Sequence, residues 1–242
     1  MKENILIQGI KIDLVNKEEA LKKVENTIKS TQNMQIVTLN PEMVIKASKQ
    51  DDFKEILNKA ELTIMDGVGI KIALKLKGIN LENTRGIDFS YELLKLADKN
   101  NFKVGFLGTD EETLQKAVTN IKKDLKNLNI VYIQNGFFDD EEKIINDIKN
   151  VSPQILLCAL GSPKQEFLNY KLKNILTNCI TIGVGGSFDV WAGKVCEAPK
   201  IWQKLGLEWL YRTIKQPERF KRIFPTLPIF LFRSIIDMGR RF

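Results

Sequence analysis

The chain has 242 residues, which is enough for one large domain with a full hydrophobic core and an appendage. It contains no histidine, so the commonest general base and the commonest metal ligand are both missing. The net charge of +7 is carried by residues 194–242, which hold eleven Lys/Arg against four Asp/Glu, while the rest of the chain is neutral. We therefore expect an anionic partner for the last fifth of the chain.

Short apolar runs alternate with amphipathic stretches from Ile5 to about Gly186. This alternation is typical of βαβ units and predicts an α/β fold with a mainly parallel, Rossmann-like sheet flanked by helices. The predicted strands are Ile5–Ile12 with a hairpin about Gly9, Gln35–Leu39, Leu62–Met65, Lys103–Leu107, Ile130–Ile133, Ile155–Leu160 and Cys179–Val184. Helix starts are predicted from caps, first-turn prolines and first-turn acids at Asn16, Pro41, Asp110, Asp139, Pro163 and Pro199.

No run approaches the ~18 apolar residues that a bilayer-spanning helix needs, and the N-terminus lacks the layout of a signal peptide. We therefore expect a cytoplasmic protein. After Ala198–Pro199, aromatic residues interleave with basic ones, and this combination favours binding to an anionic membrane surface rather than to nucleic acid. The prediction is a catalytic domain at 1–193 and a basic, aromatic-rich helical appendage at 194–242 that associates peripherally with the inner face of the cell membrane.

The cysteines and acids give no sign of a metal site. Cys158, Cys179 and Cys196 have no CxxC spacing, and the first two lie in apolar runs, so reduced core thiols are expected. The chain also has no Asp-x-Asp pair, by which many enzymes that use nucleotide sugars hold a divalent ion against the diphosphate. We expect neither a metal nor another cofactor, and positive side chains or backbone amides would then meet any leaving-group charge.

Several predicted strands end in polar or glycine-rich turns, and ligands bind at the carboxyl ends of strands in doubly wound sheets. These turns are Thr38–Pro41, Asp66–Gly69, Leu107–Asp110, Leu160–Gln165 and Gly183–Asp189. Glycine lets backbone N–H groups approach a phosphate closely, although each turn taken alone is better explained as a structural turn. The last turn lacks the third glycine of the dinucleotide fingerprint.

Asp66 ends an apolar strand and precedes a glycine turn, so it is expected to face the ligand crevice. The structural alternative is an N-cap for a helix from Val68. Because no histidine is available, Asp66 is the best candidate for a base that deprotonates an acceptor hydroxyl, and desolvation would raise its proton affinity. Arg85 is either a surface charge or a clamp for a diphosphate.

Read in order, these motifs resemble the WecG/TagA/CpsF family, glycosyltransferase family 26, and the TagA branch in particular. The resemblance covers nearly the whole chain, and its longest and most specific segments are Gly161–Glu166 and Leu207–Arg212. The other matching segments are Thr38-x-Asn40-Pro41, Asp66-Gly67-x-Gly69, Arg85-Gly-x-Asp88, Phe106-Leu-Gly108, Gly183-x-Gly185-Gly186-x-Phe188-Asp189-x-x-Ala192-Gly193, Ala198-Pro199 and Pro217-x-Arg219.

The resemblance implies inverting, metal-independent transfer of N-acetylmannosamine from UDP to undecaprenyl-diphosphate-linked N-acetylglucosamine, the step that forms the linkage unit of wall teichoic acid. It also implies the roles of individual residues. Asp66 resembles the catalytic base, and Thr38, Asn40, Arg85 and Gln165 resemble polar residues around the sugar and diphosphate. Gly108, Gly161, Gly185 and Asp189 are expected at the nucleotide and substrate pocket, and Arg212, Arg219 and Arg222 at the diphosphate and the membrane.

Three alternatives stay open at the level of sequence. The chain could use another UDP sugar, it could be an NAD(P)-dependent oxidoreductase on a similar sheet, or it could be a non-enzymatic adaptor that works through its basic tail. One departure from the family pattern is Cys196-Glu197, where one or two basic residues are expected before Ala198-Pro199. Whether the chain forms a homo-oligomer is not determined by these patterns.

Overall fold

A computed structural model describes residues 4–82, 84–204, 206–215 and 220–239. Its centre is a six-stranded sheet in which every pair of neighbouring strands is parallel, in the order β4-β3-β8-β7-β5-β6. The strands are β3 (Met34–Leu39), β4 (Leu62–Met65), β5 (Lys103–Gly108), β6 (Asn129–Gln134), β7 (Ile155–Ala159) and β8 (Ile180–Gly183). The predicted parallel α/β fold is therefore confirmed.

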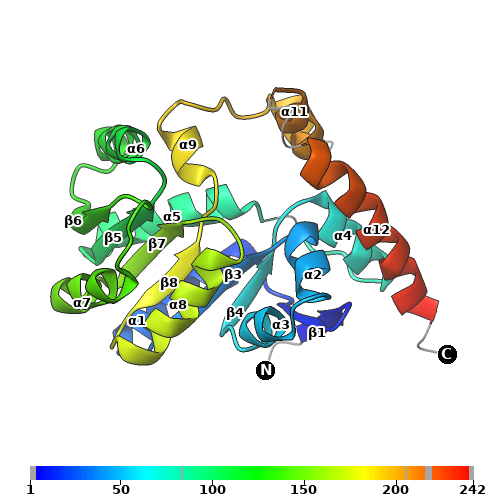
Figure 1. The fold of residues 1–242 in the computed structure, drawn as a ribbon, viewed down its shortest axis with the longest axis horizontal. Coiled ribbons are helices and arrows are strands. Elements are labelled where there is room, and N and C mark those ends of the chain that lie inside the picture. The colour runs from blue at the N-terminus through cyan, green and yellow to red at the C-terminus, as the bar shows by residue number, and fades with distance from the viewer. Residues whose placement is uncertain (1–3, 83, 205, 216–219, 240–242) are drawn as a thin grey trace.

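Helices cover both faces of this sheet (Figure 1). They are α1 (Lys17–Lys29), α2 (Pro41–Ala47), α3 (Asp51–Asn58), α4 (Val68–Leu76), α5 (Gly86–Asn100), α6 (Glu111–Asp124), α7 (Glu141–Val151), α8 (Lys164–Ile175), α9 (Ser187–Trp191), α10 (Lys200–Lys204), α11 (Glu208–Lys215) and α12 (Phe220–Gly239). Alternate strand residues point to opposite faces. Ile36 and Leu157 accordingly pack with α1, α5, α6 and α9, whereas Val37 and Cys158 pack with the helices of the other face.

The predicted hairpin about Gly9 is confirmed as β1 (Asn4–Ile7) and β2 (Ile10–Asp13). Its two turn residues, Gln8 and Gly9, have φ angles of 50° and 82°, as a tight two-residue hairpin turn requires. The Gln8 side-chain amide donates to the Phe230 carbonyl at 2.9 Å and to Ser234 Oγ at 2.8 Å. The hairpin thus ties the C-terminal helix to the rest of the chain.

Three of the six predicted helix starts lie at the expected residues. The side chains of Asn16, Asn40 and Asp110 each accept a hydrogen bond from a backbone N–H in the first turn of α1, α2 and α6. The start predicted at Asp139 is shifted, because Asp140 is the residue that caps α7. Likewise, α8 begins one residue after Pro163 and α10 one residue after Pro199.

The C-terminal part is helical, as predicted, and α12 runs along α2 and α4 (Figure 1). Phe230 of α12 is completely buried in the cluster that α2, α3, α4 and the hairpin form. Pro225 and Pro228 lie inside α12. Within the described ranges, no helix combines the length and the apolar character that crossing a membrane demands.

Candidate active site

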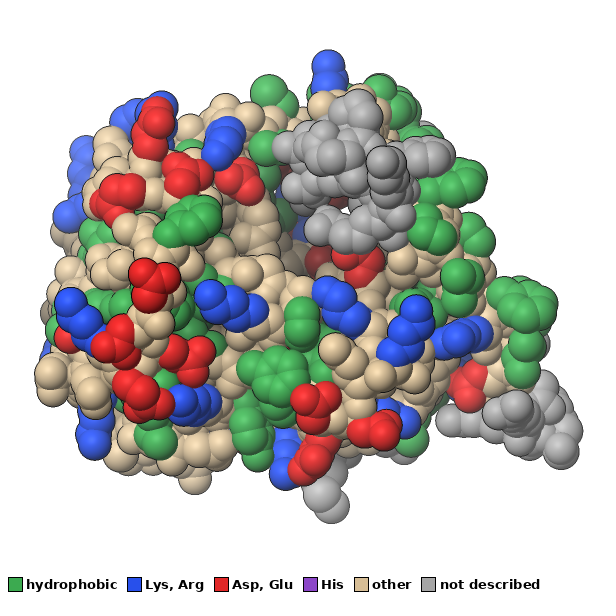
Figure 2. Space-filling view, in the orientation of Figure 1, with side chains coloured by type: hydrophobic (Ala, Val, Ile, Leu, Met, Phe, Trp, Pro, Cys, Tyr) green, Lys and Arg blue, Asp and Glu red, His purple; other side chains and the backbone are tan. Residues whose placement is uncertain are grey.

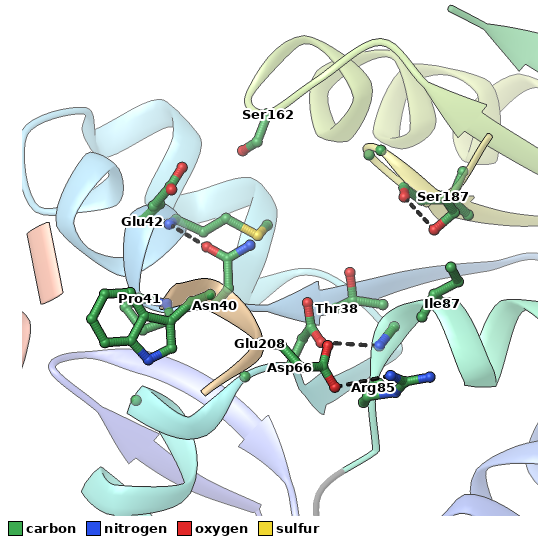
Figure 3. A pocket seen from close by; sticks show the side chains of 18 of the residues that line it. Thr38, Asn40, Pro41, Glu42, Asp66, Arg85, Ile87, Ser162, Ser187 and Glu208 are labelled. Atoms are coloured by element: carbon green, nitrogen blue, oxygen red, sulfur yellow. Dashed lines mark hydrogen bonds and ion pairs between the residues drawn. The ribbon is translucent and has the colours of Figure 1, made fainter. Parts of the chain in front are cut away.

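A cavity of about 540 Å³ opens at the carboxyl ends of the parallel strands. Its volume lies within the range of small-molecule sites. Residues following β3, β4, β7 and β8 line it together with residues of α10 to α12. Figure 3 shows the side chains from these separate segments directed toward one space. Eight of the predicted site residues lie on its wall, namely Thr38, Asn40, Asp66, Arg85, Gly161, Gln165, Gly185 and Asp189.

Asp66 follows β4 directly, and its backbone N–H donates to the Leu39 carbonyl of β3 at 2.8 Å. Its carboxylate Oδ1 accepts a hydrogen bond of 3.0 Å from the Gly86 N–H (Figure 3). The structural alternative, a side-chain cap for α4, is wrong, because Gly67 is the N-cap and no side chain caps that helix. Asp66 is therefore held at the cavity wall by a hydrogen bond from Gly86, which lies 20 residues further along the chain.

Thr38 and Gly86 bring β3 close to the start of α5. A Cβ atom added to Gly86 would lie 3.3 Å from Thr38 Cβ, which is tighter than ordinary van der Waals contact. Gly86 is also the residue whose N–H orients Asp66. The packing of Thr38 on Gly86 thus holds the Gly86 N–H in place, and this N–H orients the Asp66 carboxylate.

Arg85 lines the cavity with its guanidinium already bound to carboxylates. It makes two hydrogen bonds to Asp88, of 2.6 and 2.5 Å, and contacts Glu208 at 2.9 Å and Glu197 at 3.2 Å. The bonds to Asp88, followed by those to Glu208, hold the pKa of Arg85 above its usual range against the opposing effect of desolvation. Arg85 thereby joins the start of α5 to the segment that carries α10 and α11. Glu197, part of the departure from the family pattern, is one of its partners.

Two other predicted residues, Asn40 and Gly108, have local structural roles. Asn40 Oδ1 accepts from the Met43 N–H at 3.0 Å and caps α2, so this side chain has a structural task besides lining the cavity. Gly108 does not line the cavity, although its neighbour Thr109 does. At Gly108, φ is +132° and an added Cβ would lie 2.4 Å from the Ala159 carbonyl oxygen, so only glycine fits there.

The three arginines expected at the diphosphate lie partly or wholly outside what the structure describes. Arg219 is outside the described residues, as is Pro217. Arg212 and Arg222 belong to α11 and α12 by their backbones only. Their roles remain predictions.

Three charged residues of the cavity wall were missed by the sequence analysis, namely Glu42, Lys46 and Glu208. Lys46 lies at the end of α2, and its Nζ donates to the Ser162 carbonyl at 2.7 Å. Glu208 begins α11 and reaches Arg85 across 123 residues of sequence. The only available signals were the position of Lys46 in the helix after Asn40 and the place of Glu208 in the Leu207–Arg212 motif.

No three His, Cys, Asp or Glu side chains come together as a metal-binding group in the part of the chain that the structure describes. Cys158 and Cys179 are buried, as expected, and burial raises the pKa of both thiols, that of Cys179 to about 12. Cys196 is exposed.

Comparison with known proteins gives one consistent result. The model of the glycosyl transferase WecG/TagA/CpsF family matches residues 5–241. The chain is 33% identical over 206 residues to the N-acetylglucosaminyldiphosphoundecaprenol N-acetyl-beta-D-mannosaminyltransferase of Staphylococcus aureus. This match covers 84% of this chain and 80% of the relative. It is 31% identical over 189 residues to the enzymes of that name from Bacillus subtilis and Bacillus spizizenii, covering 78% of this chain and 74% of each relative. The chain therefore belongs to the WecG/TagA/CpsF family and is a glycosyltransferase.

Proposed function

We propose that this enzyme transfers N-acetylmannosamine from UDP to the N-acetylglucosamine of an undecaprenyl-diphosphate lipid, with inversion and without a metal ion. The names of the three relatives describe a transfer of this kind that yields a beta-linked mannosaminyl product. An α-linked UDP donor would have to be inverted to give such a product. The reaction would form the linkage disaccharide of wall teichoic acid.

The observation that carries this proposal is the position of Asp66. Its carboxylate lies on the wall of a cavity large enough for a sugar nucleotide, and a backbone N–H fixes one of its oxygens. A base must be held within hydrogen-bond reach of the proton that it removes. The chain has no histidine to take this task.

In the proposed step, the 4-hydroxyl of the acceptor gives its proton to Asp66 while its oxygen attacks the anomeric carbon of the donor. The bond between that carbon and the diphosphate oxygen breaks, and its electron pair leaves with UDP. Attack from the face opposite the leaving group inverts the configuration. The base lowers the barrier because the attacking oxygen would gain positive charge if it kept its proton while forming the new bond.

The charge that develops on departing UDP needs fixed positive groups. Lys46 lines the cavity and is held by a backbone carbonyl, whereas the charge of Arg85 is opposed by three carboxylates. We assign the diphosphate to Lys46 and to the arginines at 212, 219 and 222 of the appendage. Arginine suits this role because its planar fork can bond two phosphate oxygens.

The surface of α12 supports a peripheral position at an anionic membrane. Four of its exposed large apolar side chains recur at spacings of three and four residues, namely Ile229, Phe232, Ile235 and Ile236, and Phe224 is exposed as well. Figure 2 shows hydrophobic side chains along this edge of the molecule. An apolar helix face next to a basic segment is what interfacial binding requires. The inner face of the cell membrane is where a lipid-linked acceptor would be met.

Family membership speaks against both the oxidoreductase and the non-enzymatic adaptor. The remaining alternative is another UDP sugar, because the family description joins three named branches. The deciding experiment is a panel of UDP sugars with a diphosphate-lipid-linked N-acetylglucosamine acceptor, scored for UDP release with excess EDTA or with Mg²⁺. We expect release that requires both UDP-N-acetylmannosamine and the acceptor and that persists in EDTA. If UDP were released only with a different UDP sugar, that sugar would replace N-acetylmannosamine as the assigned donor. Loss of UDP release in EDTA would contradict metal independence.

A further inference from the structure

A carboxyl group lies buried beside the cavity and takes no part in the chemistry proposed above. Glu166 is 3% exposed, and the neighbouring Gln165 is 5% exposed. Glu166 Oε1 accepts a hydrogen bond of 2.7 Å from Gln165 Nε2. Glu166 Oε2 and the nearby Ser162 Oγ are both buried, and Ser162 lowers the pKa of the Glu166 carboxyl. Burying a carboxyl costs free energy, so its presence here calls for a function.

Gln165 connects this carboxyl to another segment of the cavity wall. Its Oε1 accepts a hydrogen bond of 3.3 Å from the Gly185 N–H, in the turn between β8 and α9. Val184, Gly185 and Gly186 of that turn line the cavity, as does Ser187 at the start of α9. The order of contacts therefore runs from Glu166 through Gln165 to a turn that faces the ligand.

Gly183 makes room for this arrangement at the end of β8. A Cβ atom added there would lie 2.3 Å from Gln165 Nε2 and 2.9 Å from Glu166 Oε1. Real Cβ atoms do not approach other atoms so closely, so both side chains are seated against bare backbone. The glycine is required by this close approach.

We propose that Glu166 is a positioning residue for donor binding, because its carboxyl fixes which way the Gln165 amide faces and Gln165 in turn fixes the Gly183–Ser187 turn. A side-chain amide can turn over and exchange its donor and acceptor ends. With Glu166 accepting from the nitrogen, the amide oxygen has to face the Gly185 N–H. The inference rests on the proposed function, since it takes the ligand of the cavity to be a nucleotide sugar.

The charges around Glu166 are compatible with this role. Lys46 of α2 and Cys158 of β7 are the titratable groups that face it. Burial raises the pKa of Glu166, while Gln165, Ser162 and Lys46 oppose that rise. A carboxyl accepts from Gln165 whether it is neutral or ionised, so the positioning does not require the charge. Glutamine at this position should then replace glutamate.

The test compares Glu166→Met with Glu166→Gln, two neutral side chains of similar size of which only the second carries an acceptor oxygen. Losing one hydrogen bond should raise the donor KM about tenfold in Glu166→Met while kcat changes little. Glu166→Gln should bring the donor KM back to within about threefold of the parent enzyme. A fall in kcat at unchanged KM in Glu166→Met would overturn the proposal.

Two further measurements separate positioning from a general structural effect. In a Gln165→Ala background, Glu166→Met should cause no additional rise in donor KM, because the contact that it acts through is already absent. Amide hydrogen exchange of the 183–187 turn should be faster in Glu166→Met than in Glu166→Gln, without any ligand. The proposal would be overturned if the two substitutions raised the donor KM independently and additively, or if the turn exchanged at the same rate in Glu166→Met and Glu166→Gln. If the parent enzyme used no nucleotide sugar, the proposed function would fail and the exchange comparison alone would decide this inference.

Discussion

At the scale of single residues, Arg85 pairs with acidic side chains at the cavity wall. Replacing Arg85 by Ala removes the guanidinium that Glu197 and Glu208 contact. We expect the donor KM to rise by roughly 10- to 100-fold, because like charges then oppose binding. The double variant Arg85→Ala/Glu208→Gln should recover part of this loss, since it removes one negative charge. Equal KM values for the single and double variants would contradict this assignment.

Lys46 provides a sharp test of the leaving-group charge. Lys46→Ala should weaken UDP binding by about tenfold, and the effect should shrink at high salt because it is electrostatic. Lys49 is the matched control, since it lies three residues further on, is exposed and does not line the cavity. Titration calorimetry with UDP measures both variants. If Lys49→Ala weakened UDP binding as much as Lys46→Ala, the loss would reflect net charge alone.

The buried carboxyl of Glu166 should also affect the free energy of unfolding. Burial raises its pKa above the usual value of 4.5. The folded state then holds a proton that the unfolded state has lost, so stability falls as pH rises from about 4.5 through the raised pKa. Relative to Glu166→Gln, the parent should lose up to about 1.4 kcal/mol per pH unit in that window. Urea unfolding at several pH values measures this difference, and parallel profiles would rule the shift out.

The site residues differ in how well the sequence could predict them. Asp66 follows β4 directly and Gln165 lies in the first turn of the helix after β7, so the parallel-sheet pattern was enough to place both at one edge of the sheet. Lys46 lies near the end of α2 and Glu208 begins α11, and both make contacts over long sequence separations. Such contacts depend on how helices pack, and periodicity alone does not give that packing.

At the scale of elements, α12 has one face in the core and one face exposed. Phe232→Glu combined with Ile236→Glu should lower affinity for anionic vesicles by roughly 100-fold, because two apolar side chains can no longer enter the interface. The melting temperature should change little, since both side chains are exposed. Phe137→Glu is the matched control, because Phe137 is 80% exposed in the loop before α7. Vesicle cosedimentation measures the parent, the α12 double variant and the Phe137→Glu control. Undiminished binding of the α12 variant would contradict membrane docking through this face.

The same helix shows where element prediction reached its limit. Strands and the hairpin followed from alternation of apolar residues and from the glycine turn. Pro225 and Pro228 lie inside α12, although proline normally disfavours a helix interior. Tertiary contacts outweigh that preference. Phe230, which follows both prolines in α12, is fully buried, and its carbonyl accepts a hydrogen bond from the Gln8 side chain. The division into 1–193 and 194–242 stays a prediction, but the core of the first part includes a side chain of the second.

At the scale of the whole molecule, the strand order brings distant parts of the chain to one edge of the sheet. The cavity wall contains residues from Thr38 near the start to Leu227 near the end. The Asp66 carboxylate after β4, the Gln165 amide of α8 and residues of α10 and α11 therefore line one cavity (Figure 3). This arrangement explains why a family resemblance can extend over 5–241 while the proposed chemistry depends on a few side chains.

The most direct test of the account is to measure turnover and UDP affinity for Asp66→Asn in excess EDTA, beside the parent enzyme. Asparagine keeps the shape and can still accept from the Gly86 N–H, but it cannot take the acceptor's proton. We expect turnover to fall by roughly 10²–10⁴-fold while the Kd for UDP stays within about threefold. Turnover near the parent rate would show that Asp66 is not the base and would contradict the central claim.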